Sequence, residues 1–361
     1  MPSRAVLATA RYAVYLSVAE LVAALYVVTE GLSQLHARLM AYAVLPTFVA
    51  GVAVAYASSS LRGRPRGAAA PEWLASAAAW AVALSGLYAS LSGYLTFLGW
   101  SLVILGASLA SLAPLSLRRA DVKASVLALG YTQALAGALA LAGPRDLYPF
   151  ALTFVSVEAV GAIYAVTLHS FPSTFGDQPS LALSALSLGL LTLGALTFAW
   201  GVRFYQALLG ASMLVSLPAF RAHRATGYLA KARTSQNPVA RGGMLFFLYG
   251  HAFAFGALAA VGAALLGSAW KGVDALVLVH AVTLGVVSMF VLIHAPMMLP
   301  VIMGWSSARR YSLAPFVLQA AGAALWPLNM HASFFLVGLA FVLDAMIVKP
   351  SREPLPLSLV R

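Results

Sequence analysis

Long apolar stretches recur from one end of this 361-residue chain to the other, and they leave few folds open to it. A run of about 18–25 apolar residues is the length that an α-helix needs to cross a bilayer. In hydrocarbon a helix is favoured because it satisfies its backbone polar groups within one segment. We therefore predict an all-α, polytopic membrane protein with twelve transmembrane helices in a single integral membrane domain. The expected spans cover residues 9–30, 34–57, 73–94, 96–117, 122–142, 147–169, 180–199, 202–219, 243–267, 273–295, 312–329 and 331–348.

The composition excludes a water-soluble fold, because hydrophobic residues make up 61% of the chain and charged residues only 9%. A water-facing surface needs far more charge than that. The chain has no cysteine, which excludes disulfides, thiolate metal sites, iron–sulfur clusters and covalently attached c-type haem. Any bound metal must therefore be held by histidine, methionine, carboxylate or tyrosine.

The positions of the basic residues predict which side of the membrane each loop faces. With twelve spans, all but four of the 22 lysines and arginines fall on one side, which the positive-inside rule assigns to the cytoplasm. Both termini then lie in the cytoplasm, and we expect a multi-pass protein of the cytoplasmic (inner) membrane. This topology explains the net charge of +12, so we expect no nucleic-acid partner. The four exceptions are Arg38, Arg145, Arg203 and Lys271.

Two histidines, His36 and His280, lie inside apolar stretches that should cross the bilayer. A polar group is expensive in hydrocarbon, so it usually serves a site there. The topology places both in the outer half of the membrane, on the second and tenth spans, where their imidazoles could clamp one b-type haem. The simpler alternative is that each histidine hydrogen-bonds to a neighbouring helix. Arg38 and Arg203 are candidate partners for the haem propionates, with ordinary interfacial arginines as the alternative.

Three more histidines are candidates for a second metal site. His251 lies in the ninth span among aromatic residues and His331 opens the twelfth, so either could ligate a second haem or copper, or only make hydrogen bonds. His294 precedes Met297 and Met298, and imidazole with thioethers suits Cu(I). Methionine is also ordinary core filling. His294 lies about 21 Å along its helix from His280, so these two histidines cannot bind the same iron.

Three carboxylates are expected inside the membrane, which are Glu20 in the first span, Glu158 in the sixth and Asp344 in the twelfth. Such groups pair, stay protonated or form a proton path. Glu158 lies near the middle of its span with Tyr164 on the same helix, so it is the first candidate for proton handling; a structural hydrogen bond is the alternative. No Walker A motif, Rossmann glycine pattern or serine nucleophile elbow occurs in a credible context, so ATP-driven transport is unsupported.

The sequence around these histidines resembles a known family. The segment HARLM at 36–40 is similar to the His-Ala-His-Glu-Met motif of the NnrS family, twelve-helix haem- and copper-containing membrane proteins linked to nitric oxide stress. The segment HAVTLG at 280–285 resembles that family's His-Ala-Leu-Thr-Val-Gly motif. Arg38 replaces the second histidine of the first motif, and the family's Gly-His-Thr-Gly-Arg stretch is absent. The resemblance implies His36 and His280 as axial ligands of a haem b, and nitric oxide as the small diatomic ligand.

The first motif is also similar to the second span of subunit I of the haem–copper oxidases, whose low-spin haem takes its other ligand from the tenth span. This distant similarity implies a haem–copper-oxidase-like bundle, although the adjacent histidine pair on span 7 of that family has no counterpart here. We therefore expect a haem-binding, and also copper-binding, membrane protein in nitric oxide or respiratory redox chemistry. One alternative is a quinol-linked, nitric oxide reductase-like oxidoreductase or its subunit, which would work with a partner subunit. The other is a secondary transporter with buried carboxylates.

Overall fold

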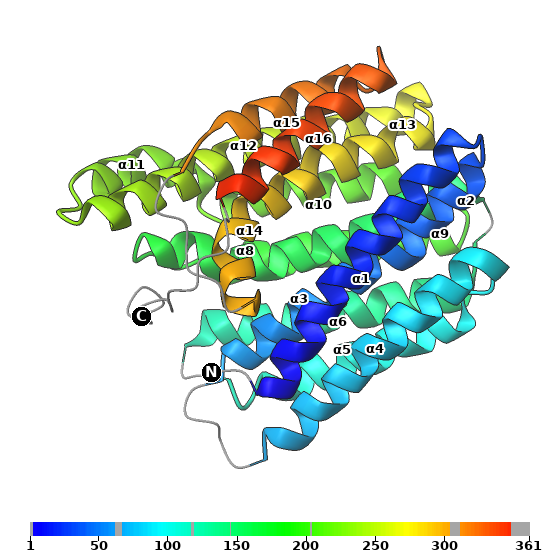
Figure 1. Cartoon of the computed structure of the whole chain (residues 1–361), viewed down its shortest axis with the longest axis horizontal. Coiled ribbons are helices and arrows are strands. Elements are labelled where there is room, and N and C mark those ends of the chain that lie inside the picture. The colour runs from blue at the N-terminus through cyan, green and yellow to red at the C-terminus, as the bar shows by residue number, and fades with distance from the viewer. Residues whose placement is uncertain are drawn as a thin grey trace.

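The computed structural model of the chain describes residues 3–61, 67–116, 119–144, 146–202, 204–303 and 311–347. Within these ranges the regular elements are all helical and there is no strand, as the sequence predicts. Eight helices have the length and apolar composition that crossing a membrane requires. Figure 1 shows the helices packed alongside one another in a bundle, with α1 beginning and α16 ending toward the same end of it.

Nine of the expected spans correspond to a helix without interruption. Three of these helices, with 17, 15 and 12 residues, are shorter than the usual crossing length: α5, α10 and α15. A further short helix, α11 (Ala225–Arg233), lies in the basic loop that follows α10. The nine are α1 (Arg4–Thr29), α4 (Ala69–Ser92), α5 (Thr96–Leu112), α6 (Ala120–Ala142), α9 (Leu181–Ala199), α10 (Tyr205–Ala219), α12 (Pro238–Lys271), α15 (Ala314–Leu325) and α16 (Met330–Ile347).

The second, sixth and tenth expected spans differ, because a short π-helical segment interrupts each of them. In a π-helix the backbone N–H bonds to the carbonyl five residues back, which inserts one residue into the turn. The bonds Leu45 to Met40, Gly161 to Ser156 and Ser288 to Thr283 have this spacing. The three interrupted helices are α2 (Ser33–Arg38), η1 (Leu39–Val44) and α3 (Leu45–Ser59); α7 (Leu147–Val155), η2 (Ser156–Val160) and α8 (Gly161–Thr174); and α13 (Ala275–His280), η4 (Ala281–Val287) and α14 (Ser288–Met303).

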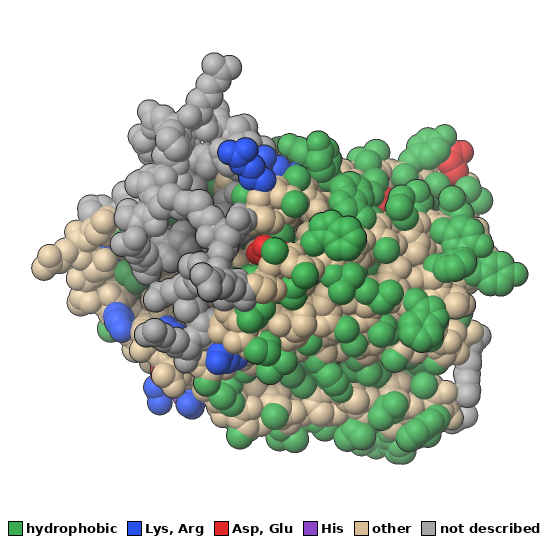
Figure 2. Space-filling view, turned by 90° about the horizontal axis from the view of Figure 1, so that it is seen from below, with side chains coloured by type: hydrophobic (Ala, Val, Ile, Leu, Met, Phe, Trp, Pro, Cys, Tyr) green, Lys and Arg blue, Asp and Glu red, His purple; other side chains and the backbone are tan. Residues whose placement is uncertain are grey.

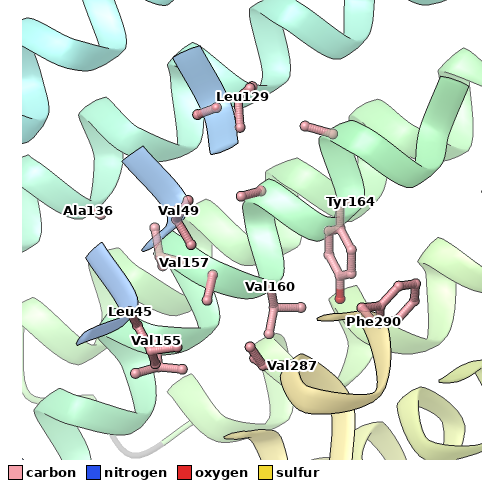
Figure 3. Close-up of a cluster of buried hydrophobic side chains, with 14 of the residues drawn as sticks. Leu45, Val49, Leu129, Ala136, Val155, Val157, Val160, Tyr164, Val287 and Phe290 are labelled. Atoms are coloured by element: carbon pink, nitrogen blue, oxygen red, sulfur yellow. The ribbon is translucent and has the colours of Figure 1, made fainter. Parts of the chain in front are cut away.

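These three interrupted helices form the centre of the bundle. α7 packs against both α2 and α13, and η2 packs against both α3 and η4. In the most apolar part of the helix Leu147–Thr174, 89% of the residues are buried, against 28% in α1. Figure 3 shows part of the shared core, in which Val157 and Val160 of η2 lie between Leu45 of α3 and Val287 of η4.

The outside of the bundle is apolar over most of its length. Large hydrophobic side chains cover the face shown in Figure 2, and on that face the described lysines and arginines gather toward one end. Leu84 of α4, Trp270 of α12 and Phe335 of α16 are 67%, 71% and 70% exposed. An apolar surface this extensive is a liability in water and suits contact with lipid. The fold is therefore that of a multi-pass membrane protein.

The loop between α8 and α9 is tied to the basic segment that contains α11. Asp177 accepts hydrogen bonds from Arg224, at 2.8 Å, and from the Tyr228 hydroxyl, at 2.7 Å. Burial acts to raise the pKa of Asp177, but the hydrogen bonds from Tyr228, the Gln178 N–H and Arg224 outweigh it and hold the pKa below its ordinary value. The Phe175 ring stacks on Tyr228, with centroids 4.5 Å apart. The polar end of the bundle is thus ordered by these contacts.

Helix α4 approaches η1 most closely at Gly86. Pro46 has no N–H and so cannot donate to the Tyr42 carbonyl four residues earlier in the chain. That carbonyl oxygen lies against Gly86, where an added Cβ would overlap it. Because the obstructing atoms belong to the backbone of η1, a side chain at position 86 could be accommodated only by moving one of the two helices.

We expect Gly86→Ala to destabilise the protein by about 1–3 kcal/mol, the usual cost of overpacking a rigid contact. The measurement is the unfolding temperature of the detergent-solubilised protein. Gly189→Ala is the matched control, because nothing lies within 4 Å of a Cβ at that position. An unchanged unfolding temperature for Gly86→Ala would mean that α4 and η1 are further apart than the structure shows.

Candidate functional site

His36 and His280, the two predicted ligands of one group, lie on helices that both pack against α7. His36 lies on α2 and His280 is the last residue of α13, and their imidazoles are within electrostatic range of each other. Each is partly buried and lies just before a π-helical segment. The His280 ring stacks on Trp326, with ring centroids 4.0 Å apart and the planes 13° from parallel. This contact fixes one face of the ring against the end of α15.

Each of these imidazoles is anchored through Nδ1 to a backbone carbonyl. His36 Nδ1 lies 2.8 Å from the Ala24 oxygen of α1, and His280 Nδ1 lies 2.8 Å from the Leu276 oxygen of its own helix. Because a carbonyl oxygen only accepts, Nδ1 carries the proton in both rings and Nε2 keeps its lone pair. This is the usual arrangement of metal-binding histidines, in which the second ring nitrogen donates to a carbonyl and fixes the tautomer.

Arg38 lies two residues after His36, at the end of α2. Its guanidinium faces the turn after α4, where a Cβ on Gly93 would be 3.7 Å from it. None of the described acidic residues forms an ion pair with Arg38, so its charge is free to bind an external anion. Arg203, the other expected propionate partner, lies outside the described residues.

Glu158 lies within η2, at the centre of the bundle, and is fully buried. Neither of its carboxyl oxygens has a hydrogen-bond partner in the described structure. Gln133 lies beside it, but its Nε2 donates to the backbone carbonyl of Glu158 at 3.4 Å. Glu20 has one weak partner, Thr47, at 3.4 Å, and Asp344 is buried with one oxygen unpartnered. The three carboxylates lie on three different helices and form no cluster.

Two glutamines that the sequence did not point to support the π-helical segments. Gln133 of α6 donates to the Glu158 carbonyl at 3.4 Å, and Gln319 of α15 donates to the Leu284 carbonyl at 2.6 Å. Both are fully buried. Ser90 of α4 lies 3.1 Å from the Arg38 carbonyl, but the shorter hydrogen bond of its hydroxyl, at 2.8 Å, is to the Gly86 carbonyl of its own helix. The available signal was a glutamine inside an apolar run, which is uncommon in a span.

The structure also brings His251 of α12 and His294 of α14 together, which the sequence analysis had treated separately. Their ring centroids are 5.4 Å apart. Each Nδ1 lies within hydrogen-bond distance of the carbonyl four residues earlier, at 2.8 Å from Phe247 and 2.9 Å from Phe290. Both Nε2 atoms are buried without a partner among the described residues.

The remaining candidates lie apart from these two pairs. His331 is exposed at the start of α16. Met298 packs with Ala10, Ala55 and Ile302, and the side chain of Met297 lies outside the described part of the structure. The described chain brings no three side chains of histidine, cysteine, aspartate or glutamate together in one metal-binding group.

One ion pair near the polar end was missed by the sequence analysis. Asp121, at the start of α6, is paired with His169 of α8 at 2.7 Å and with Arg119 at 2.9 Å. Its acidic partner takes His169 out of the set of free ligands. A lone aspartate after a basic pair gave no sign that it would contact a histidine in a different span.

Comparison with known proteins adds no assignment. No family model, no curated protein and no solved structure matches this chain.

We expect Gln319→Leu to destabilise the protein by about 1–2 kcal/mol, because the buried Leu284 carbonyl loses its donor. The unfolding temperature in detergent is the measurement. Gln34→Leu is the control, since Gln34 is exposed at the start of α2. Equal behaviour of the two variants would show that the Leu284 carbonyl does not depend on Gln319.

We expect Glu158→Gln to leave the unfolding temperature unchanged or raise it. The amide has the same shape as the carboxyl group, no partner is lost, and no charge can form where it is expensive. A clear drop in unfolding temperature would show that the carboxylate has a stabilising partner after all. Glu158→Leu, which also changes the shape, serves as the comparison.

Proposed function

We propose that this protein is a haem-binding membrane protein of the cytoplasmic membrane, with His36 and His280 as the axial ligands of a haem b, acting in nitric oxide or respiratory redox chemistry. The observation that supports the proposal is that the helices carrying these two histidines both pack against α7, with each imidazole held through Nδ1 by a carbonyl and the two rings within electrostatic range of each other.

The chemistry of the donor set fits haem iron. Two imidazoles on different helices, each held by a carbonyl through Nδ1, are the kind of ligands that a bis-histidine haem takes. Arg38 lies two residues from one ligand and is unpaired within the described chain, so it is suited to hold a propionate. Arg203 is proposed for the second propionate from its expected position at the outer end of the bundle.

Each protein group has a distinct task at this site. The carbonyls of Ala24 and Leu276 fix the tautomers, and Trp326 fixes the ring plane of His280. When bound, the haem would supply one-electron chemistry. Because imidazole would fill both axial positions, we place electron transfer at this site and expect a diatomic gas to bind elsewhere in the protein.

Nitric oxide as the gas is supported by the resemblance of the two histidine motifs to the NnrS family. Quinol as an electron donor and a partner subunit belong to the variant of this proposal in which the protein is a nitric oxide reductase-like oxidoreductase. Glu158 is the proposed proton carrier, supported by its burial between the central helices and by its unpartnered carboxyl oxygens.

The proposed topology has twelve crossings with both termini in the cytoplasm. It is supported by a helix at each expected span and by the start of α1 and the end of α16 at the same end of the bundle. The short helices α10 and α15 would cross where flanking residues or local thinning compensate for their length.

The test is an absorption spectrum of the purified protein, oxidised and reduced, together with metal analysis. We expect a Soret band and, in the oxidised protein, the electron paramagnetic resonance of low-spin iron. His36→Ala and His280→Ala should each abolish or convert the low-spin signal. His223→Ala is the control, because His223 is exposed in the basic loop.

Two outcomes would count against parts of this proposal, and a third measurement would refine it. The absence of a Soret band ends the haem assignment and favours a secondary transporter, for which the buried carboxylates Glu20, Glu158 and Asp344 are the relevant feature. An unchanged spectrum in either variant removes that histidine from the pair. Quinol-dependent consumption of nitric oxide by the purified protein would distinguish an enzyme from a binding protein.

A further inference from the structure

Two buried imidazole nitrogens without partners stand out from the rest of the interior. His251 is completely buried, and its Nε2, like that of His294, has no hydrogen-bond partner in the described structure. Both Nδ1 atoms are held by carbonyls of their own helices, so both Nε2 atoms carry lone pairs. A buried polar atom without a partner costs free energy, and native interiors contain few of them. Two unpartnered nitrogen atoms in adjacent rings indicate a ligand that binds to both of them.

The separation of the two rings matches a shared metal ion. A metal–nitrogen bond of about 2 Å places an ion roughly 3 Å from the centroid of each ligating imidazole. Two such rings therefore have centroids no more than roughly 6 Å apart. The centroids of His251 and His294 are 5.4 Å apart, with the planes at 79°. No third ligand from histidine, cysteine, aspartate or glutamate joins them within the described residues.

The surroundings of the two rings select the kind of ion. Phe171, Phe247 and Phe255 lie around His251, with ring centroids 4.7 Å, 4.2 Å and 5.4 Å from it. Phe290 contacts both imidazoles, at 5.7 Å and 6.2 Å. Rings packed this closely against His251 leave no room for a macrocycle, which excludes a haem between these two histidines.

Charge favours a monovalent ion that accepts imidazole ligands. The two ligands are neutral and no acidic side chain joins the pair, so a divalent ion would leave two uncompensated charges in an apolar cage, where unpaired charge is expensive. Cu(I) carries one charge, accepts imidazole ligands and is stable with few of them. Zinc, in contrast, is almost always held by four ligands in a structural site.

We propose that His251 and His294 together form a Cu(I) site, separate from the His36 and His280 pair. The site replaces the methionine-based copper site expected from Met297 and Met298, because His251 supplies the second donor. It lies about four helical turns along α13 and α14 from His280, so the two sites occupy different halves of the bundle. The inference does not depend on whether the outer pair binds haem.

The experiment is Cu(I) binding to the detergent-solubilised full-length protein, measured anaerobically by competition with a chromophoric Cu(I) chelator. We expect one ion per chain and X-ray absorption showing Cu(I) with nitrogen ligands and few neighbours. His251→Gln and His294→Gln should each weaken binding by more than about 100-fold, since losing even an outer partner of a ligand costs ~10–100-fold. The double variant should lose no more than either single variant, because both ligands serve one ion.

The controls separate loss of the ion from loss of the fold. His223→Gln changes an exposed histidine and should bind Cu(I) as the unaltered protein does. Met298→Leu tests the thioether alternative and should also leave binding unchanged. Retention of the gel-filtration profile and of the helical circular dichroism shows that each variant is folded.

Cu(I) binding that survives both histidine substitutions, no binding by the folded full-length protein, or Zn²⁺ bound more tightly than Cu(I) would each overturn the proposal. The readout is independent of the haem test, since the outer pair is followed by its Soret band and the inner pair by bound copper. Haem can therefore be present with the copper site absent, or the reverse, and each result is interpretable by itself.

Discussion

The structure depends on one constraint, that backbone polar groups inside a bilayer must find their partners within the protein. A regular helix meets this demand by itself. The three central helices depart from it, because each contains a π-helical segment in which the bonding pattern shifts by one residue. The buried side chains of Gln133 and Gln319 donate to carbonyls in two of these segments. The irregular centre is thus held by polar contacts from the surrounding helices.

The irregular turns coincide with polar groups to which we assign the proposed function. His36 and His280 each lie just before such a turn, and Glu158 lies inside one. π-helical turns are frequent at functional sites, since an inserted residue turns the flanking side chains relative to a regular helix. A strained or irregular helix in a membrane core requires additional partners, and here those partners are present. The irregular turns therefore receive hydrogen bonds from side chains of neighbouring helices.

The polar residues of the interior lie in separate groups along the bundle. His36 and His280 lie toward one end, Glu158 near the middle, and His251 with His294 beyond it. The ion pair of His169 with Asp121 lies at the end where α6 begins and α8 finishes. Apolar side chains such as Val157, Val160 and Val287 fill the space between the central helices (Figure 3).

Much of this arrangement was predictable, and the limits have physical reasons. Apolar runs predicted the helices because a bilayer allows few other structures, but adjacent spans nearly merge in the sequence around Gly93 and Gly201. The glycines there have positive φ angles of 81° and 75°, which end the helices cleanly. The prediction of a span over residues 312–329 was too long, since the corresponding helix, α15, ends at Leu325. Hydropathy averages over a window and does not detect where a helix stops.

The sequence alone determined that the chain is helical and apolar on its outside, because hydrocarbon accepts no other surface, and that His36, Glu158 and His280 lie within the spans. It could not pair residues on different helices, since lipid-exposed and buried apolar positions look alike when lipid is as apolar as the core. Only the tertiary structure brought His251 to His294, placed His169 beside Asp121, and turned Gln319 toward the Leu284 carbonyl. Those pairings depend on how the helices are rotated about their axes, and that rotation is decided by packing.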